Sequence, residues 1–63
     1  MNLNKLKGLR AENNMTQSEV AKLLNLSEQS YLKKEKGKVP FKDYEIANLC
    51  KIFNVSVTYF FEQ

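Results

Sequence analysis

The sequence predicts an all-α fold: a compact bundle of four to five short helices, forming a single domain over residues 1–63. Three observations lead to this prediction. Apolar residues recur at intervals of three and four through most of the chain. Residues typical of helix starts and ends separate these stretches. The one segment rich in β-branched and aromatic residues, VSVTYFF, has no second strand to pair with.

The first helix is expected from about Asn2 to Glu12, where Leu3, Leu6 and Leu9 keep a helical spacing. The following stretch, TQSE, is a capping box in which Thr16 and Glu19 satisfy each other's backbone amides. It predicts a second helix that ends at Asn25, a residue that tolerates a left-handed turn. The residues of this helix expected in the core are Val20, Ala21, Leu23 and Leu24.

Ser27 is the expected cap of a third helix, which Gly37 ends. A fourth helix is predicted from about Asp43 to Asn54, with Ile46, Leu49, Cys50 and Phe53 as its core stripe. Ser56 is expected to cap one last turn or two, whose Phe60 closes the core.

Composition argues against several classes of function. The chain has no histidine and one cysteine, Cys50, so it offers neither a zinc site nor an internal disulfide. Its acidic residues are scattered, and its two glycines form no phosphate-binding loop. We therefore expect no enzyme activity, no metal and no cofactor. The absence of a long apolar run or a signal-peptide core predicts a cytoplasmic protein without a membrane span.

The positive charge is local. The segment KKEKGKVPFK, residues 33–42, holds five lysines and one acid, whereas the whole chain has a net charge of only +3. Such a basic patch indicates an acidic partner such as a nucleic acid, and a merely solubilising helix end is the alternative.

The second and third helices, joined by a turn of about three residues, form a helix-turn-helix pattern. Ala21 is small enough to let the two helices cross closely, and Asn25 suits the turn between them. The apolar residues expected to fix the crossing are Val20, Leu24, Leu26 and Tyr31.

From Leu6 to Phe60 the sequence resembles the Cro/C1-type helix-turn-helix family of phage and bacterial repressors. The matching stretches are LR at 9–10, TQSEVAKLL from 16, LS at 26–27, KEKGKVP from 34 and FNVSVTYFF near the end. The resemblance implies a lambda-repressor-like domain of five helices, with the third helix, Ser27–Lys36, in the DNA major groove.

The sequence departs from the family pattern at three positions. Asn25 replaces the common glycine, Tyr31 stands where isoleucine or valine is usual, and Lys34 replaces a large apolar residue. Tyr31 can be buried if its hydroxyl reaches water or a partner. Lys34 is expected to lay its aliphatic stem over the core and keep its ammonium in solvent.

Helical geometry places Gln29, Lys33 and Lys36 on one exposed side of the third helix, with Glu28 and Leu32 on a shoulder. Glutamine can pair with adenine and lysine with guanine, and Leu32 can contact a thymine methyl. The resemblance implies base reading at Glu28, Gln29 and Lys33. For Glu28, reading a cytosine and merely stabilising the helix start remain equal alternatives.

A second group of residues is expected to contact phosphates. The capped helix start presents Thr16 and Gln17, and Gln17 resembles the family's phosphate-contacting glutamine. Lys36, Lys38 and Lys42 follow the third helix and would flank the groove. Arg10 and Glu35 fall toward the interior, and the resemblance implies that they form a structural ion pair.

The aromatic stretch near the end is the candidate for contact with a second copy. Tyr59, Phe60 and Phe61 carry more aromatic surface than one short helix can bury, and with Phe60 in the core Tyr59 and Phe61 remain for the contact. We therefore expect a weak homodimer that tightens on palindromic double-stranded DNA. The sequence thus predicts a sequence-specific DNA-binding transcriptional regulator, a Cro-like repressor that occupies an operator. The alternative is a protein-interaction module, such as an antitoxin or anti-repressor, that uses its aromatic end.

Overall fold

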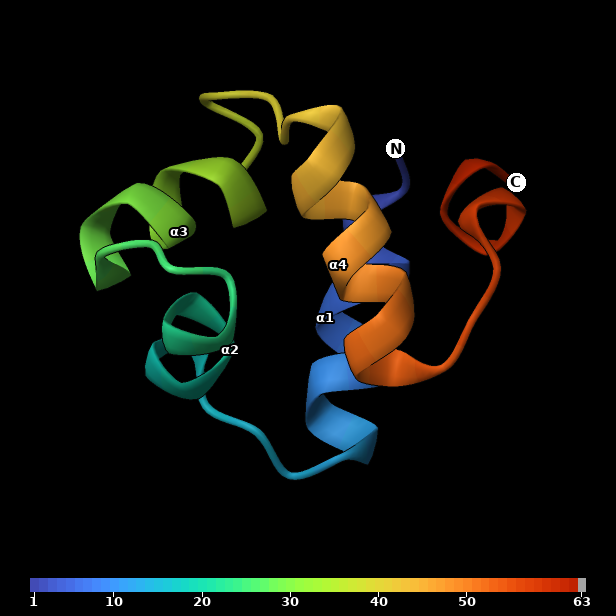
Figure 1. Ribbon diagram of the computed structural model, residues 1–63, viewed down its shortest axis with the longest axis horizontal. Helices are drawn as coiled ribbons and strands as arrows, with labels where there is room; N and C mark the ends of the chain where they lie inside the picture. The colour runs from blue at the N-terminus through green and yellow to red at the C-terminus, as the bar shows by residue number, and fades with distance from the viewer. Residues whose placement is uncertain (63) are drawn as a thin grey trace.

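The computed structural model describes residues 1–62, and within them every regular secondary-structure element is a helix, which confirms the predicted fold class (Figure 1). Four α-helices are followed by a 3-10 helix, η1. Their bounds are α1 Leu3–Glu12, α2 Gln17–Leu23, α3 Glu28–Glu35, α4 Asp43–Phe53 and η1 Val57–Phe61.

The predicted helix starts are present, with one exception. In the capping box, the Thr16 hydroxyl accepts from the Glu19 amide at 3.1 Å, and the Glu19 carboxylate accepts from the Thr16 amide at 2.9 Å. The Ser27 hydroxyl accepts from the Ser30 amide at 3.2 Å. Ser56 stands at the start of η1 as expected, but its hydroxyl pairs with that of Thr58 and makes no cap hydrogen bond.

The helix ends follow from residues that accept a left-handed backbone. Asn25 has φ 58° and Asn54 has φ 55°, and Gly37 after α3 has φ 83°. All three were expected to end helices. Asn14, in the turn after α1, adopts the same conformation at φ 54°, so asparagine does at three turns what glycine does at one.

The core lies between all five helices. Its buried residues are Leu6, Leu9, Val20, Ala21, Leu24, Tyr31, Ile46, Leu49, Phe53 and Phe60. Phe60 closes the core as predicted, and its carbonyl accepts from the Asn2 amide at 2.6 Å, which fastens η1 to the start of α1. Cys50 is half-buried against the core.

Leu23 was expected in the core, and this prediction is wrong, because 56% of its surface is exposed. Val20, Ala21 and Leu24 form the buried stripe of α2. Leu23 lies about 100° around the helix from Leu24, beyond the edge of that stripe.

The prediction for Lys34 is also wrong. Its ammonium does not reach solvent: the residue is only 7% exposed, and Nζ donates to both carboxylate oxygens of Glu45 at 2.6 Å. Glu45 is itself buried and accepts from the Lys42 amide at 2.7 Å. A charged side chain at this depth needs an opposite charge beside it, and α4 supplies one.

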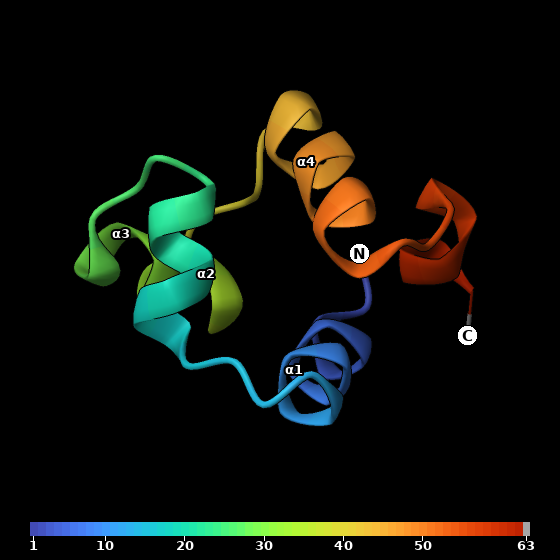
Figure 2. The same cartoon turned by 60° about the horizontal axis from the view of Figure 1, so that its bottom comes forward.

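The helices are arranged so that α3 and η1 lie at opposite ends of the molecule, with α1 and α4 between them (Figures 1 and 2). Helix α2 packs beside α3. Within residues 1–62, no helix has the length and apolar character that a membrane crossing requires.

Candidate functional site

Helix α3 lies at one outer edge of the molecule (Figure 2), and its exposed side chains are polar. Glu28, Gln29 and Lys33 are exposed on α3, and Leu32 is half-buried. Lys36, the residue that caps the helix, is also exposed. The side chains expected to read bases are thus accessible on the surface of this helix.

The opposite face of α3 determines which side points outward. Tyr31, Lys34 and Glu35 are all buried, and each makes a polar contact with another buried group. Tyr31 also packs edge-on against Phe41, with ring centroids 6.0 Å apart. Because this face is held by polar contacts as well as by packing, the rotation of α3 about its axis is fixed.

The Glu35 carboxylate is the centre of a cluster that joins α1, α2 and α3. Arg10 donates to it twice, from Nε to Oε2 at 3.1 Å and from Nη2 to Oε1 at 3.2 Å. Gln17 Nε2 donates to Oε1 at 2.9 Å, and the Tyr31 hydroxyl donates to Oε2 at 2.5 Å. The ion pair between Arg10 and Glu35 is therefore present, and two further donors share the same carboxylate.

These donors decide the ionisation of the cluster. Burial alone would raise the pKa of Glu35, but the hydrogen bonds from Tyr31, Gln17 and Arg10 outweigh it and hold the pKa below its ordinary value of 4.5. The pKa of the Tyr31 hydroxyl is raised, first by burial and then by the neighbouring Glu35 carboxylate. At neutral pH the carboxylate is charged and the tyrosine is a neutral donor.

The start of α2 lies at the edge of this cluster. Thr16 is exposed, whereas Gln17 is half-buried and its side-chain amide turns inward to Glu35. Arg10 also donates from Nη1 to the Met15 carbonyl at 3.2 Å, which ties the loop before α2 to α1. The backbone that carries the candidate phosphate contacts, Thr16 and Gln17, is thus held in place by the hydrogen bond from Arg10 and by the capping box.

The lysines of the basic segment, residues 33–42, fall into an exposed group and a single buried residue. Lys33, Lys36, Lys38 and Lys42 are exposed, while Lys34 is buried against Glu45. The turn at Gly37 is closed by a hydrogen bond from the Lys38 amide to the Lys33 carbonyl at 2.9 Å. Lys36 and Lys38 therefore flank a defined turn at the end of α3, whereas Lys42 stands at the start of α4.

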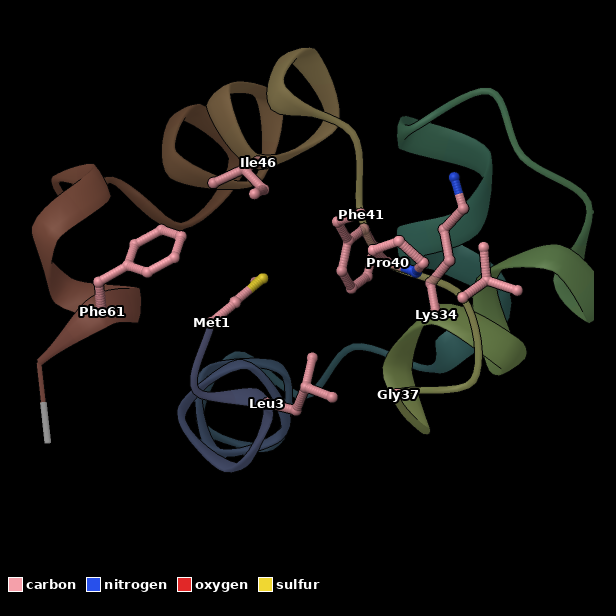
Figure 3. A pocket seen from close by; sticks show the side chains of 9 residues that line it. Met1, Leu3, Lys34, Gly37, Pro40, Phe41, Ile46 and Phe61 are labelled. Atoms are coloured by element: carbon pink, nitrogen blue, oxygen red, sulfur yellow. The ribbon is translucent and has the colours of Figure 1, made fainter.

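Helix η1, at the other end of the molecule from α3 (Figure 1), presents aromatic side chains. Phe61 is 57% exposed, and Tyr59 is half-buried with the Lys5 ammonium 4.7 Å from its ring centroid. A pocket of about 300 Å³ opens beside Phe61, whose ring points with Met1 and Ile46 toward the same space (Figure 3). The other residues that line it are Leu3, Lys34, Gly37, Val39, Pro40 and Phe41.

Sequence reasoning missed the contact of Lys34 with Glu45 and the contacts of Tyr31 and Gln17 with Glu35. Eleven positions separate Lys34 from Glu45, and no local pattern connects them. The contact of Tyr31 could have been predicted from its departure from the family pattern, because a tyrosine at a buried position needs a hydrogen-bond partner for its hydroxyl.

Within residues 1–62, no three His, Cys, Asp or Glu side chains gather closely enough to hold a metal ion. In the comparison with known protein families, a family model described as helix-turn-helix matches residues 6–60. Neither a curated protein nor a solved structure matches the chain.

Proposed function

The chain belongs to the Cro/C1-type helix-turn-helix family, a family of DNA-binding regulators and not of enzymes, and from this premise we propose that it is a sequence-specific transcriptional repressor. It would act in the bacterial cytoplasm or nucleoid and block transcription by occupying an operator. The observation that carries the proposal is the outward face of α3, where Gln29 and Lys33 are exposed.

The proposed base contacts come from four residues of α3. Gln29 suits adenine, whose N6 and N7 match a side-chain amide, and Lys33 suits the O6 and N7 acceptors of guanine. Glu28 can accept from cytosine N4, and Leu32 can contact a thymine methyl group. The exposure of Glu28, Gln29 and Lys33 supports this assignment.

The proposed phosphate contacts come from both sides of α3. Thr16 and Gln17 would contact one strand from the start of α2. Lys36, Lys38 and Lys42 would contact the backbone from the turn and loop that follow α3. Their positive charges would displace condensed counterions, so binding should weaken steeply as salt increases.

A repressor of this size would gain affinity by binding two half-sites as a dimer. We place the contact between copies at the exposed Phe61, the partly covered Tyr59 and the apolar pocket beside them. Helix η1, which carries Tyr59 and Phe61, lies at the opposite end of the molecule from α3 (Figure 1), and the pocket extends from Phe61 toward Lys34 and Gly37. The homodimer is expected to be weak in solution and tighter on a palindromic operator.

The test begins with the selection of bound duplexes from a random pool, followed by titrations of selected and random duplexes at two salt concentrations. We expect Gln29→Ala to lose preference for the selected duplex. Lys38→Ala should weaken both duplexes alike and reduce the salt slope by about one. Lys51→Ala, an exposed lysine on α4, serves as the matched control and should change neither.

Two results would contradict the proposal. Failure of the pool to yield a preferred sequence would remove sequence-specific binding. If Gln29→Ala and Lys38→Ala each weakened binding to the selected and the random duplex by the same factor, the assignment of Gln29 to bases and Lys38 to phosphates would be wrong.

A second candidate function is a protein-interaction module such as an antitoxin or anti-repressor. The exposed Phe61 beside an apolar pocket favours it, because such a surface can receive a partner protein. The salt titration separates the two functions, since only DNA binding should weaken by orders of magnitude between low and physiological salt.

A further inference from the structure

Tyr31 places a hydrogen-bond donor in the interior of the domain. The residue is fully buried, and its hydroxyl donates to Glu35 Oε2 at 2.5 Å. A phenylalanine would fill nearly the same volume, so packing alone does not require the oxygen. The structure gives the hydroxyl a specific partner, one helical turn away in α3.

The Glu35 carboxylate divides its donors evenly between its two oxygens. Oε1 accepts from Gln17 and from Arg10 Nη2, and Oε2 accepts from Tyr31 and from Arg10 Nε. The terminal torsion of a glutamate side chain has broad, soft minima. Removal of the tyrosine hydroxyl would leave Oε2 with Arg10 Nε as its one donor, so the carboxylate would be held less firmly and its orientation could shift.

A turn of this carboxylate moves the acceptor of Gln17. The Gln17 amide donates to Oε1 at 2.9 Å, and a primary amide has a second N–H that can donate to a phosphate. The direction of that second N–H depends on where Oε1 lies. The orientation of the half-buried Gln17 amide on α2 is thus coupled to a buried hydroxyl on α3.

We propose that Tyr31 is a positioning residue for DNA binding: through the shared carboxylate of Glu35, its hydroxyl orients the Gln17 amide toward a DNA phosphate. The inference rests on the phosphate contact of Gln17 in the proposed function. Tyr31 itself, which is fully buried, would touch no DNA.

A double-mutant cycle on the full chain tests the coupling. Affinity for the selected duplex is measured for wild type, Tyr31→Phe, Gln17→Ala and the double variant, well below the unfolding temperature of each. We expect Gln17→Ala to weaken binding roughly fivefold to tenfold, the worth of one hydrogen bond. Tyr31→Phe should weaken it about threefold, and it should add nothing once Gln17 is alanine.

The matched control uses another proposed phosphate contact. In a Lys38→Ala background, Tyr31→Phe should keep its full threefold effect, because Lys38 has no contact with the carboxylate cluster. A purely structural role would instead lower affinity equally in all backgrounds, including Gln17→Ala. That result would overturn the proposal.

The cycle also separates failure of this inference from failure of the proposed function. If Gln17→Ala weakens binding and Tyr31→Phe does not, Tyr31 has no positioning role and the phosphate contact stands. If Gln17→Ala has no effect, the phosphate contact itself is wrong and the inference falls with it.

NMR of the protein without DNA tests the contact between Gln17 and Glu35 directly. By NMR, the side-chain amide protons of Gln17 should exchange with water more slowly than those of the exposed Gln29, because Glu35 holds the Gln17 amide. In Tyr31→Phe the Gln17 amide resonances should shift toward those of an unbound side chain. Equal exchange of Gln17 and Gln29 in the wild type would contradict the proposal.

Discussion

Two buried carboxylates connect α3 to the rest of the domain. Glu35 joins it to α1 and α2 through Arg10 and Gln17, and Glu45 joins it to α4 through Lys34. Burial of an unpaired charge is costly, whereas a paired and hydrogen-bonded one is tolerated. Each carboxylate is therefore a point at which loss of one partner leaves an uncompensated charge inside a very small core.

Lys34→Met should destabilise the domain by roughly 3–5 kcal/mol, the usual cost of breaking a buried ion pair. Methionine removes the ammonium and leaves the Glu45 carboxylate buried without its counterion. Lys34→Met combined with Glu45→Leu should recover most of the loss. Urea unfolding measures each free energy, with the exposed neighbour Lys33→Met as the control, expected within about 0.5 kcal/mol of wild type. No recovery in the double variant would contradict the argument.

The same pairs predict how stability depends on pH. Burial opposes the ionisation of Glu45, but donors from Lys34 and Lys42 lower its pKa below 4.5, and the pKa of Glu35 is lowered likewise. When the folded-state pKa is depressed, the unfolded chain binds more protons in acid, so stability is present above the unfolded pKa and is lost as pH falls through the folded value.

We therefore expect a free energy of unfolding that is flat from about pH 8 to pH 5 and falls below about pH 4.5. The flat region follows because the chain has no histidine to titrate there. The combination of Lys34→Met with Glu45→Leu should show a shallower decline in acid. Urea unfolding at several pH values measures both curves, and identical declines would show that Glu45 contributes nothing.

At the scale of helices, the ends of the elements were predictable from short sequence patterns. The capping box at Thr16, the cap at Ser27 and the left-handed ends at Asn25, Gly37 and Asn54 each involve residues a few positions apart. Such caps and turns depend on residues that are close in sequence and not on tertiary packing. The exposure of Leu23 was not predictable in this way, because it depends on the angle at which α2 meets its neighbours.

The left-handed turn between α2 and α3 predicts that glycine and alanine substitutions have opposite orders of stability at Asn25 and at a helical position. Asn25→Gly should be neutral or slightly stabilising, and Asn25→Ala should cost about 1 kcal/mol, because only glycine has no side-chain penalty at φ 58°. Asn48, exposed within α4, should show the reverse order, with alanine favoured over glycine by about 1 kcal/mol. Thermal or urea unfolding measures all four variants, and the same order at both positions would contradict the assignment.

At the scale of the whole molecule, α3 with its exposed polar side chains and η1 with the exposed Phe61 lie at opposite ends (Figure 1). The accessible residues of α3 were predictable because a helical wheel separates Gln29 and Lys33 from Tyr31. The inward turn of the Gln17 amide was not, because it depends on a carboxylate eighteen positions away. The sequence thus predicted which residues of α3 are exposed, but it did not predict the direction of a side chain, Gln17, that a buried carboxylate orients.

The separation of the two ends makes self-association testable without disturbing the proposed DNA face. Phe61→Ser should leave stability nearly unchanged, because the side chain is 57% exposed. It should weaken self-association in sedimentation and weaken binding to a two-half-site duplex, while affinity for one half-site stays the same. Leu23→Ser, which alters an equally exposed side chain on α2, should leave sedimentation unchanged. Equal effects of both substitutions on sedimentation would show that general surface hydrophobicity, not the surface around Phe61, joins the copies.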